Sequence, residues 1–301
     1  MTAMSETILF FGSGPVAAQS LELLAQDFTI EAVVTKPQPA HHKEAFPVLE
    51  VAERLGLKTL TPTNKQELSE LFATKPATSK LGVVIDYGII IGQDVIDYFP
   101  LGIVNSHFSL LPRWRGADPI SFAILEGDRQ TGVSLMLIVA GLDEGPLLDE
   151  ALYDIPANQT TPELTDALVQ LSAQRLKVVL PEYVAGKLMP KPQHGTPTYS
   201  RKLSKDDGQL DFSKTAAQLE RQIHAFTPWP GSRTTLGDKE LIITAAHVMD
   251  GSGKPGSVWQ DGKNFGFYTT EGIFLIDKLK PAGKAEMTSQ AFLAGYRSLL
   301  N

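Results

Sequence analysis

Short apolar runs alternate with amphipathic stretches over about the first 155 residues. The runs that predict strands are almost wholly apolar and cover residues 7–11, 30–34, 81–85, 102–107 and 133–138. Amphipathic segments at 16–25 and 46–55 predict helices between them. Continuous apolar strands separated by helices are typical of a mainly parallel sheet that is covered on both faces. We therefore expect a doubly wound, Rossmann-like α/β domain.

The pattern changes after residue 180. An amphipathic helix predicted at 161–180 is followed by a stretch rich in proline and glycine, which is typical of a linker. Beyond it come one predicted helix at 215–224 and several short apolar runs, at 241–243, 256–259, 265–268 and 273–276. Many short strands spaced by turns rich in Gly, Asp and Asn predict a small β-barrel.

Composition narrows the class of protein. The 301 residues are 43% hydrophobic and 20% charged, as expected for two globular domains. No apolar run approaches the roughly 20 residues that span a bilayer, which excludes an integral membrane protein, and the N-terminus lacks the pattern of a secretory signal. The absence of cysteine excludes disulfides and thiolate metal sites, so we expect a cytoplasmic protein.

The net charge of −7 is unevenly spread. Residues 1–200 hold 14 Lys and Arg against 23 Asp and Glu, a net of −9, whereas residues 201–301 hold 13 against 11, a net of +2. An acidic protein is a poor nonspecific binder of nucleic acid, because phosphate neutralisation drives that affinity. The last third of the chain still leaves room for one face that contacts phosphates.

A glycine-rich turn follows the first predicted strand. Gly12-Ser13-Gly14-Pro15-Val16-Ala17 fits the dinucleotide-binding pattern, whose main-chain amides can hold a phosphate. That pattern also requires an acidic residue at the end of the second strand, but Val34-Thr35-Lys36 stands there and Glu31 lies at the other end. A tight strand-to-helix turn therefore competes with a nucleotide site, and we favour the turn.

Asn105 and His107 lie two residues apart where a predicted strand ends, so both side chains point to one face. Ligands bind at this carboxyl edge in open α/β sheets. An amide and an imidazole there can donate hydrogen bonds to a developing oxyanion, although a strand-end Asn and His can equally cap a loop.

Asp143 lies in a turn after the next strand, within Ala140-Gly141-Leu142-Asp143-Glu144-Gly145. If neighbouring strands end level, Asp143 can face His107. A carboxylate beside an imidazole favours its charged form, so the pair can move a proton; a turn-forming Asp is the alternative. Asn, His and Asp without a Ser or Cys nucleophile at a matching strand end favour an acyl transfer in which the substrate supplies the nucleophile.

Two stretches of the chain together resemble the folate-dependent formyltransferase family. The first is Asn105-Ser106-His107-Phe108-Ser109-Leu110-Leu111-Pro112, closed by Gly116, and the second is Gly141-Leu142-Asp143-Glu144-Gly145. Arg113-Trp114-Arg115-Gly116 is similar to the branch that acts on methionyl-tRNA. The resemblance continues through Tyr199 and residues 202–205, 215–220 and 226–231, so it covers nearly the whole chain. Glycinamide ribonucleotide formyltransferases stop after the first domain, which argues against that branch.

The resemblance implies a catalytic trio of Asn105, His107 and Asp143. It also implies transfer of the formyl group of 10-formyltetrahydrofolate to the α-amino group of methionyl-initiator tRNA, with no metal. The residues expected to contact folate are Ser109, Leu110, Leu111 and Pro112, together with the main chain of Asp86, Tyr87 and Gly88. Ile85, Ile89 and Ile90 would enclose the pterin, although core packing is the better interpretation for at least two of them.

The last domain would then be an OB-like barrel that holds the tRNA. The resemblance implies a catalytic domain at 1–183, a linker at 184–203 and a tRNA-binding domain at 204–301, in a monomer. Candidate tRNA contacts are Arg113, Lys202, Lys205, Arg233 and Lys280, with Lys278 and Lys284 as further candidates.

Two departures from the family stand out. The loop at 36–45 is shorter than the family's and has no arginine, although in the family this loop enters the acceptor arm, and Asp86 stands where the family usually has a small residue. Four alternative functions stay open: an amino-sugar N-formyltransferase, a 10-formyltetrahydrofolate hydrolase, a noncatalytic RNA-binding module, and a dehydrogenase that uses the Gly12 turn.

Overall fold

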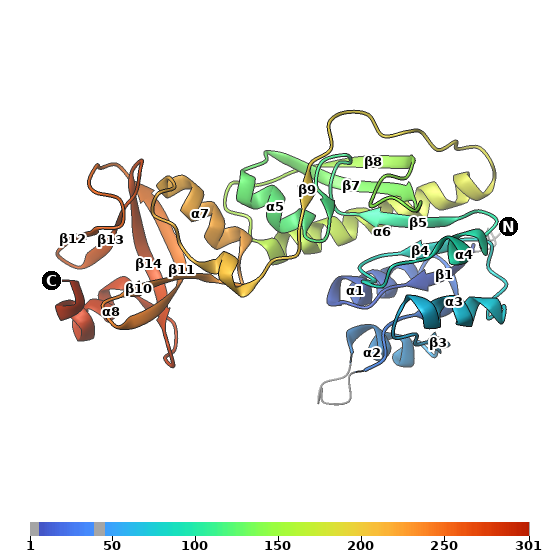
Figure 1. Ribbon diagram of the computed structural model, residues 1–301, viewed down its shortest axis with the longest axis horizontal. Helices are drawn as coiled ribbons and strands as arrows, with labels where there is room; N and C mark the ends of the chain where they lie inside the picture. The colour runs from blue at the N-terminus through green and yellow to red at the C-terminus, as the bar shows by residue number, and fades with distance from the viewer. Residues whose placement is uncertain (1–5, 39–45, 301) are drawn as a thin grey trace. The chain divides into compact units, whose positions relative to one another are not determined.

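The computed structural model describes residues 6–38 and 46–300, which fall into two compact units (Figure 1). The first unit contains the described residues up to Gly116, with Thr131–Tyr153 and Thr165–Tyr199. The second contains Ala117–Gln130, Asp154–Leu164 and the described residues from Ser200 onward. Residues 117–130 thus pack with the later part of the chain although the sheet of the first unit continues after them.

A seven-stranded sheet forms the centre of the first unit, in the order β3-β2-β1-β4-β5-β7-β8. The strands are β1 (Thr7–Phe11), β2 (Thr29–Val34), β3 (Thr59–Leu60), β4 (Gly82–Val84), β5 (Ile103–His107), β7 (Gln130–Leu137) and β8 (Leu147–Asp154). From β3 to β5 the neighbours are parallel, whereas β7 runs antiparallel to β5. The predicted Rossmann-like, mainly parallel sheet is confirmed.

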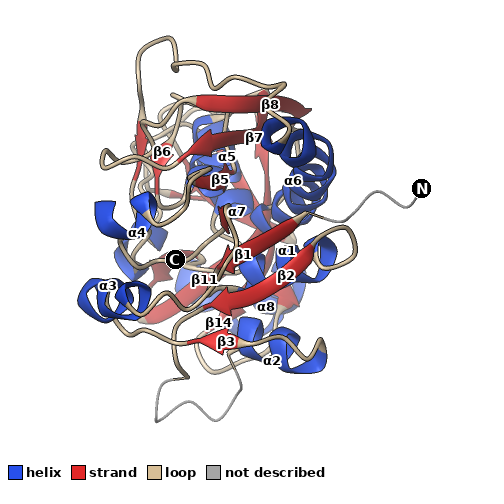
Figure 2. Cartoon of the chain, turned by 90° about the vertical axis from the view of Figure 1, so that its right-hand side faces the viewer, coloured by secondary structure: helices blue, strands red, loops and turns tan. Residues whose placement is uncertain are grey.

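Helices cover both faces of this sheet (Figure 2). Their bounds are α1 (Pro15–Leu24), α2 (Pro47–Arg54), α3 (Lys65–Ala73), α4 (Gln93–Asp97) and α6 (Thr161–Val184). On one face α6 lies beside α1, where Gln19 Nε2 of α1 donates a hydrogen bond to Asp166 Oδ1 of α6 at 3.2 Å. On the other face, Leu68 and Phe72 of α3 pack against Phe11 of β1. The carboxyl end of β5, which carries Asn105 and His107, therefore belongs to a sheet whose two faces are both covered by helices.

An antiparallel sheet forms the second unit, in the order β10-β11-β14-β13-β12, with β15 paired to β14. The strands are β10 (Ser232–Leu236), β11 (Lys239–Met249), β12 (Val258–Asp261), β13 (Asn264–Tyr268), β14 (Ile273–Pro281) and β15 (Met287–Thr288). Its core contains Leu219 and Ile223 of α7 (Ala216–Ala225) and Phe292 of α8 (Ser289–Tyr296). The predicted small β-domain is thus confirmed as an antiparallel sheet packed against helices.

The remaining elements are short. Helix α5 (Pro119–Glu126) belongs to the second unit, where Arg221 Nε of α7 donates a hydrogen bond to Leu125 O at 3.2 Å. Strands β6 (Arg115–Gly116) and β9 (Tyr199–Ser200) pair with each other, and two 3₁₀ helices, η1 (Lys205–Gly208) and η2 (Arg297–Leu300), complete the order. None of the helices within the described ranges is both long and apolar enough to cross a bilayer.

Candidate active site

Asn105 and His107 lie at the carboxyl end of β5, between β4 and β7. In the sheet register Asn105 stands beside Val84 of β4 and Met136 of β7. The Asn105 side chain is half-buried and that of His107 is only 7% exposed. Because residues two apart on a strand share a face, the amide and the imidazole lie on the same side of the sheet edge.

The imidazole of His107 is held in one orientation. Its Nε2 lies 2.9 Å from the main-chain oxygen of Trp114, and since a carbonyl oxygen only accepts, Nε2 carries a hydrogen. Its Nδ1 lies 3.8 Å from Asp143 Oδ2. Neutral His107 therefore presents a lone pair on the side of Asp143, and protonated His107 presents an N–H there.

Asp143 lies in the loop between β7 and β8, with 14% of its side chain exposed. Its Oδ2 accepts a hydrogen bond from the main-chain nitrogen of Gly116 at 2.7 Å. The predicted reason for its approach to His107, strands that end level, is wrong, because β7 is antiparallel to β5 and Leu137 pairs with Val104. The loop instead turns back toward the end of β5, with a left-handed φ of +50° at Asp143 itself.

The segment Ser109 to Pro112, expected to line a folate site, is fixed to β7 by one hydroxyl. Ser134 Oγ donates to Ser109 O at 2.7 Å and accepts from Leu111 N at 3.0 Å. Ser109 and Leu111 are buried, whereas Leu110 and Pro112 are half-buried. The latter two are thus the members of the segment that a ligand can reach most directly.

Residues Asp86, Tyr87 and Gly88 follow β4 beside the glycine-rich turn. Asp86 O accepts a hydrogen bond from Ser13 N at 2.9 Å, and Asp86 has a left-handed φ of +46°. The Tyr87 ring lies edge-on to Phe11, with 5.6 Å between ring centroids, and burial raises the pKa of its phenol. The Tyr87 side chain is therefore part of the core, and a ligand would meet this segment through its main chain.

The three isoleucines beside this segment differ in burial. Ile85 is fully buried and Ile89 packs against the core that contains Phe11, whereas Ile90 is 75% exposed. Core packing thus accounts for two of the three, and Ile90 is the one that a ligand could cover.

The glycine-rich turn lacks the acid that a dinucleotide site requires. Glu31 accepts hydrogen bonds from Thr78 N at 2.7 Å and Ser79 N at 2.6 Å, so its carboxylate supports another loop. A Cβ atom on Gly14, the N-cap of α1, would overlap the Asp86 carboxylate. A carboxylate of the chain itself thus lies where the phosphate of a nucleotide would approach the helix N-terminus.

The candidate tRNA contacts are in different surroundings. Lys202, Lys205 and Lys280 are exposed, and so are Lys278 and Lys284. Arg113 is half-buried, with its guanidinium 4.3 Å from the centroid of the Trp114 ring. Arg233 is half-buried as well, and its Nη2 donates to Pro230 O at 2.9 Å. The five lysines are therefore more accessible to a large ligand than the two arginines.

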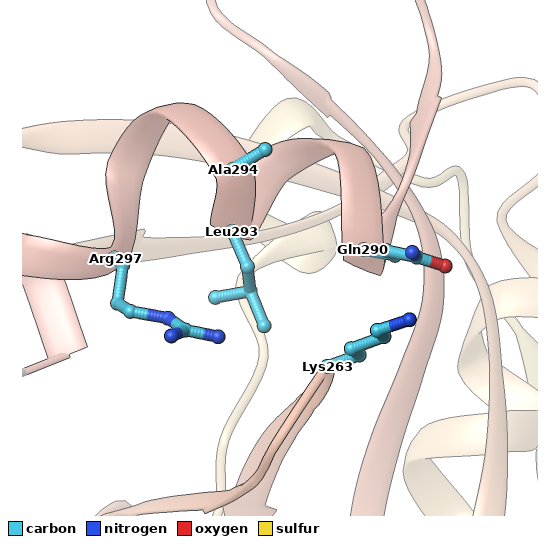
Figure 3. Close-up of a pocket in the computed structure, with 5 residues that line it drawn as sticks. All are labelled: Lys263, Gln290, Leu293, Ala294 and Arg297. Atoms are coloured by element: carbon cyan, nitrogen blue, oxygen red, sulfur yellow. The ribbon is translucent and has the colours of Figure 1, made fainter.

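The second unit has a pocket of about 360 Å³ that the sequence did not single out (Figure 3). Its lining consists of Lys263, Gln290, Leu293, Ala294 and Arg297. Lys263 comes from the turn between β12 and β13 and Arg297 from η2, and their side chains lie on either side of Leu293. Arg297 Nη2 donates to Gly262 O at 2.7 Å, which fixes one of the two cations.

Over 6–38 and 46–300, no three His, Cys, Asp or Glu side chains come together as metal ligands would. His41 and His42, whose loop departs from the family, lie outside the described residues.

Comparison with known proteins assigns the family. Residues 7–180 match the formyl transferase family, and residues 202–297 match the formyl transferase C-terminal domain. The methionyl-tRNA formyltransferase of Ectopseudomonas mendocina is 40% identical over 288 residues, which cover 92% of this chain and 91% of that protein. The methionyl-tRNA formyltransferase of Myxococcus xanthus is 38% identical over 296 residues, with 96% and 95% covered.

A solved structure agrees on the fold. The N-formyltransferase of Helicobacter canadensis, in complex with folinic acid and dTDP-3-aminofucose, has a TM-score of 0.68, covers 91% of this chain and 98% of its own, and is 18% identical. At that identity the likeness concerns the fold alone, so the sequence relatives decide between branches. The chain belongs to the methionyl-tRNA formyltransferase family.

Proposed function

We propose that this protein transfers the formyl group of 10-formyltetrahydrofolate to the α-amino group of methionyl-initiator tRNA. The observation that carries the proposal is the approach of Asp143 to His107 beside Asn105, at the carboxyl end of a central strand. Full-length relatives with this activity in their names support the choice of substrates.

The reaction forms a bond between the methionine nitrogen and the formyl carbon and breaks the bond from that carbon to N10 of the folate. An α-amine has a pKa of about 8, so a substantial fraction is protonated at neutral pH and must lose a proton before it attacks. We assign Asp143 to the removal of this proton and to the orientation of His107. After attack the methionine nitrogen carries one hydrogen more than the amide product keeps, and this proton passes to N10 as the folate leaves.

Attack produces a tetrahedral intermediate with a negative oxygen. The Asn105 amide and the Nδ1–H of protonated His107 are the two donors assigned to it, while Nε2 stays bonded to Trp114 O. Each such donor lowers the barrier by on the order of 3 kcal/mol. Replacement of Asn105 by Ala should therefore slow turnover by about 10²–10³-fold while folate affinity persists.

The folate is proposed to bind between Ser109–Pro112 and the main chain of Asp86–Gly88. Leu110 and Pro112 are accessible, and the Tyr87 side chain is committed to the core, so main-chain groups of the second segment remain for the pterin. The folinic acid in the Helicobacter canadensis enzyme supports a reduced folate as donor.

The tRNA is proposed to bind through exposed cations of the second unit. We assign residues 1–183 to catalysis, 184–203 to a linker and 204–301 to tRNA binding, in a cytoplasmic monomer. Lys202, Lys205 and Lys280 are proposed phosphate contacts, and the pocket with Lys263 and Arg297 adds two cations on either side of an apolar residue.

The test offers purified protein and 10-formyltetrahydrofolate three acceptors in parallel: methionyl-initiator tRNA, a dTDP-amino sugar, and water alone. Formyl transfer to the tRNA at a rate far above the other two is the expected result. Transfer to the sugar, or release of formate at the same rate without acceptor, would overturn the proposal in favour of a sugar N-formyltransferase or a hydrolase.

A further inference from the structure

Residues 191–198, which the sequence predicts as part of a linker, are hydrogen-bonded both to the segment that follows β5 and to the loop that contains Asp143. Thr198 Oγ1 accepts from Trp114 N at 3.0 Å, and Thr198 O accepts from Arg115 N at 2.9 Å. At the other end, Lys191 exchanges main-chain hydrogen bonds of 2.6 and 2.8 Å with Leu147. We call residues 191–198 the bridging segment.

Gln193 lies at the centre of the bridging segment and contacts the Asp143 loop directly. Its Nε2 donates to Asp143 O at 2.8 Å and to Gly145 O at 2.9 Å. Its Oε1 accepts from Arg115 Nη2 at 2.8 Å and Nε at 3.3 Å. The remaining Arg115 nitrogen, Nη1, donates to Glu144 Oε1 at 3.0 Å, which closes a ring of hydrogen bonds around the loop.

The chemistry of the partners fixes the orientation of this amide. Main-chain oxygens of Asp143 and Gly145 only accept, and the guanidinium of Arg115 only donates. A flipped amide would set its oxygen against two carbonyls and its NH₂ against a cation. Gln193 thus uses both donor hydrogens and its acceptor oxygen, so no other amino acid of similar size reproduces the set.

Asp143 requires such support, because a non-glycine residue at φ +50° is in a sparsely populated conformation. Its carboxylate is held at one end by Gly116 N, and its main chain is held by Gln193. A displacement of about 1 Å would take Oδ2 out of the geometry that faces His107 Nδ1.

From these contacts we infer that Gln193 is a positioning residue for formyl transfer, which holds the Asp143 loop so that the carboxylate faces His107. This inference rests on the proposed function for its substrates. The bridging segment is then part of the catalytic unit as well as a connection to the second unit.

The test compares Gln193→Glu and Gln193→Ala with His194→Ala, an exposed neighbour in the same segment, as control. Glu keeps the acceptor oxygens for Arg115 but loses both N–H donors to the Asp143 loop. This variant therefore tests the hydrogen bonds to the Asp143 loop while the bridging segment stays bonded to Arg115. We expect kcat to fall about 10–100-fold in both Gln193 variants, with KM for folate and tRNA changed less than about 3-fold. The control should match wild type.

A second readout does not depend on catalysis. The ring ¹H–¹³C NMR signal of His107, assigned by loss in His107→Ala, should shift in Gln193→Glu and stay in place in His194→Ala. Wild-type kcat and an unmoved His107 signal in Gln193→Glu would overturn the inference. Lack of transfer to methionyl-tRNA by the wild-type enzyme would instead count against the proposed function, with the NMR comparison still deciding the role of Gln193.

Discussion

At the scale of single residues, Gly14 and Asp86 form a matched pair, since a side chain at 14 would overlap the carboxylate at 86. Replacement of Gly14 by Ala should lower the free energy of unfolding by about 1–3 kcal/mol, because extra volume in a packed site is destabilising. In an Asp86→Ala background the same replacement should cost less than half as much. Urea unfolding of the wild type, the two single variants and the double variant measures this difference.

Equal costs of Gly14→Ala in the two backgrounds would show that the contact does not account for glycine at this position. The pair also gives Asp86, the residue that departs from the family, a structural role beside its proposed place at the pterin. A carboxylate near the N-terminus of α1 interacts favourably with the helix dipole.

At the scale of elements, η1 begins with a capping box in which Asp207 Oδ2 accepts from Ser204 N at 2.7 Å and from Ser204 Oγ at 2.8 Å. A hydrogen bond from Arg201 Nη1 at 2.8 Å and those from Ser204 hold the pKa of Asp207 well below its usual range. We expect Asp207→Asn to lower the free energy of unfolding by about 1–2 kcal/mol at pH 7.

The sign of its pH dependence follows from the lowered pKa. Because the folded pKa is below the unfolded value of about 3.9, the stabilisation is complete above that value and is lost as pH falls toward the folded pKa. The difference in unfolding free energy between wild type and Asp207→Asn should therefore shrink between pH 5 and pH 2, as followed by urea titration at each pH. A difference that stays constant over this range would contradict the assignment.

Elements with strong local patterns could be predicted from the sequence. The apolar run around Val104 predicts β5, and the reciprocal cap between Thr215 and Gln218 marks the start of α7. Helix α3 was missed, although Asn64 accepts from Gln66 N and Glu67 N and is a readable cap. The direction of β7 was not predictable, since pairing with β5 is decided by contacts distant in sequence.

Part of the candidate site could likewise be predicted from the sequence, and part could not. Asn105, His107 and Asp143 stand in a motif, and the structure brings the last two within 3.8 Å. Gln193 has no local signal, because its partners Arg115, Asp143 and Gly145 lie 48 to 78 residues away. A side chain whose role is to bond two distant loops can be found only once those loops are folded.

At the scale of the whole molecule, the net charge is −7 while residues 201–301 carry a net of +2, from 13 cationic and 11 anionic side chains. Binding of tRNA should weaken steeply with added salt, and folate binding much less, because counterion release accompanies phosphate contacts. Lys263→Ala should reduce the slope of log affinity against log salt by about 1, and the exposed Lys254→Ala should not. Filter binding at several salt concentrations measures both slopes.

If Lys263→Ala and Lys254→Ala had the same slope as wild type, the pocket beside Arg297 would not be a tRNA contact. Equal salt sensitivity of folate and tRNA binding would count against the second unit as the tRNA platform.

The most direct measurement is the single-turnover rate of formyl transfer from 10-formyltetrahydrofolate to methionyl-initiator tRNA in wild type, His107→Ala, Asp143→Ala and the double variant. Each single replacement is predicted to slow transfer by about 10²–10⁴-fold with folate affinity nearly unchanged, and the double variant to be little slower than the slower single one, since the two side chains act as a unit. A double variant whose loss of rate equals the product of the two single losses would contradict the proposed joint role of His107 and Asp143. Near-wild-type transfer in either single variant would contradict it as well.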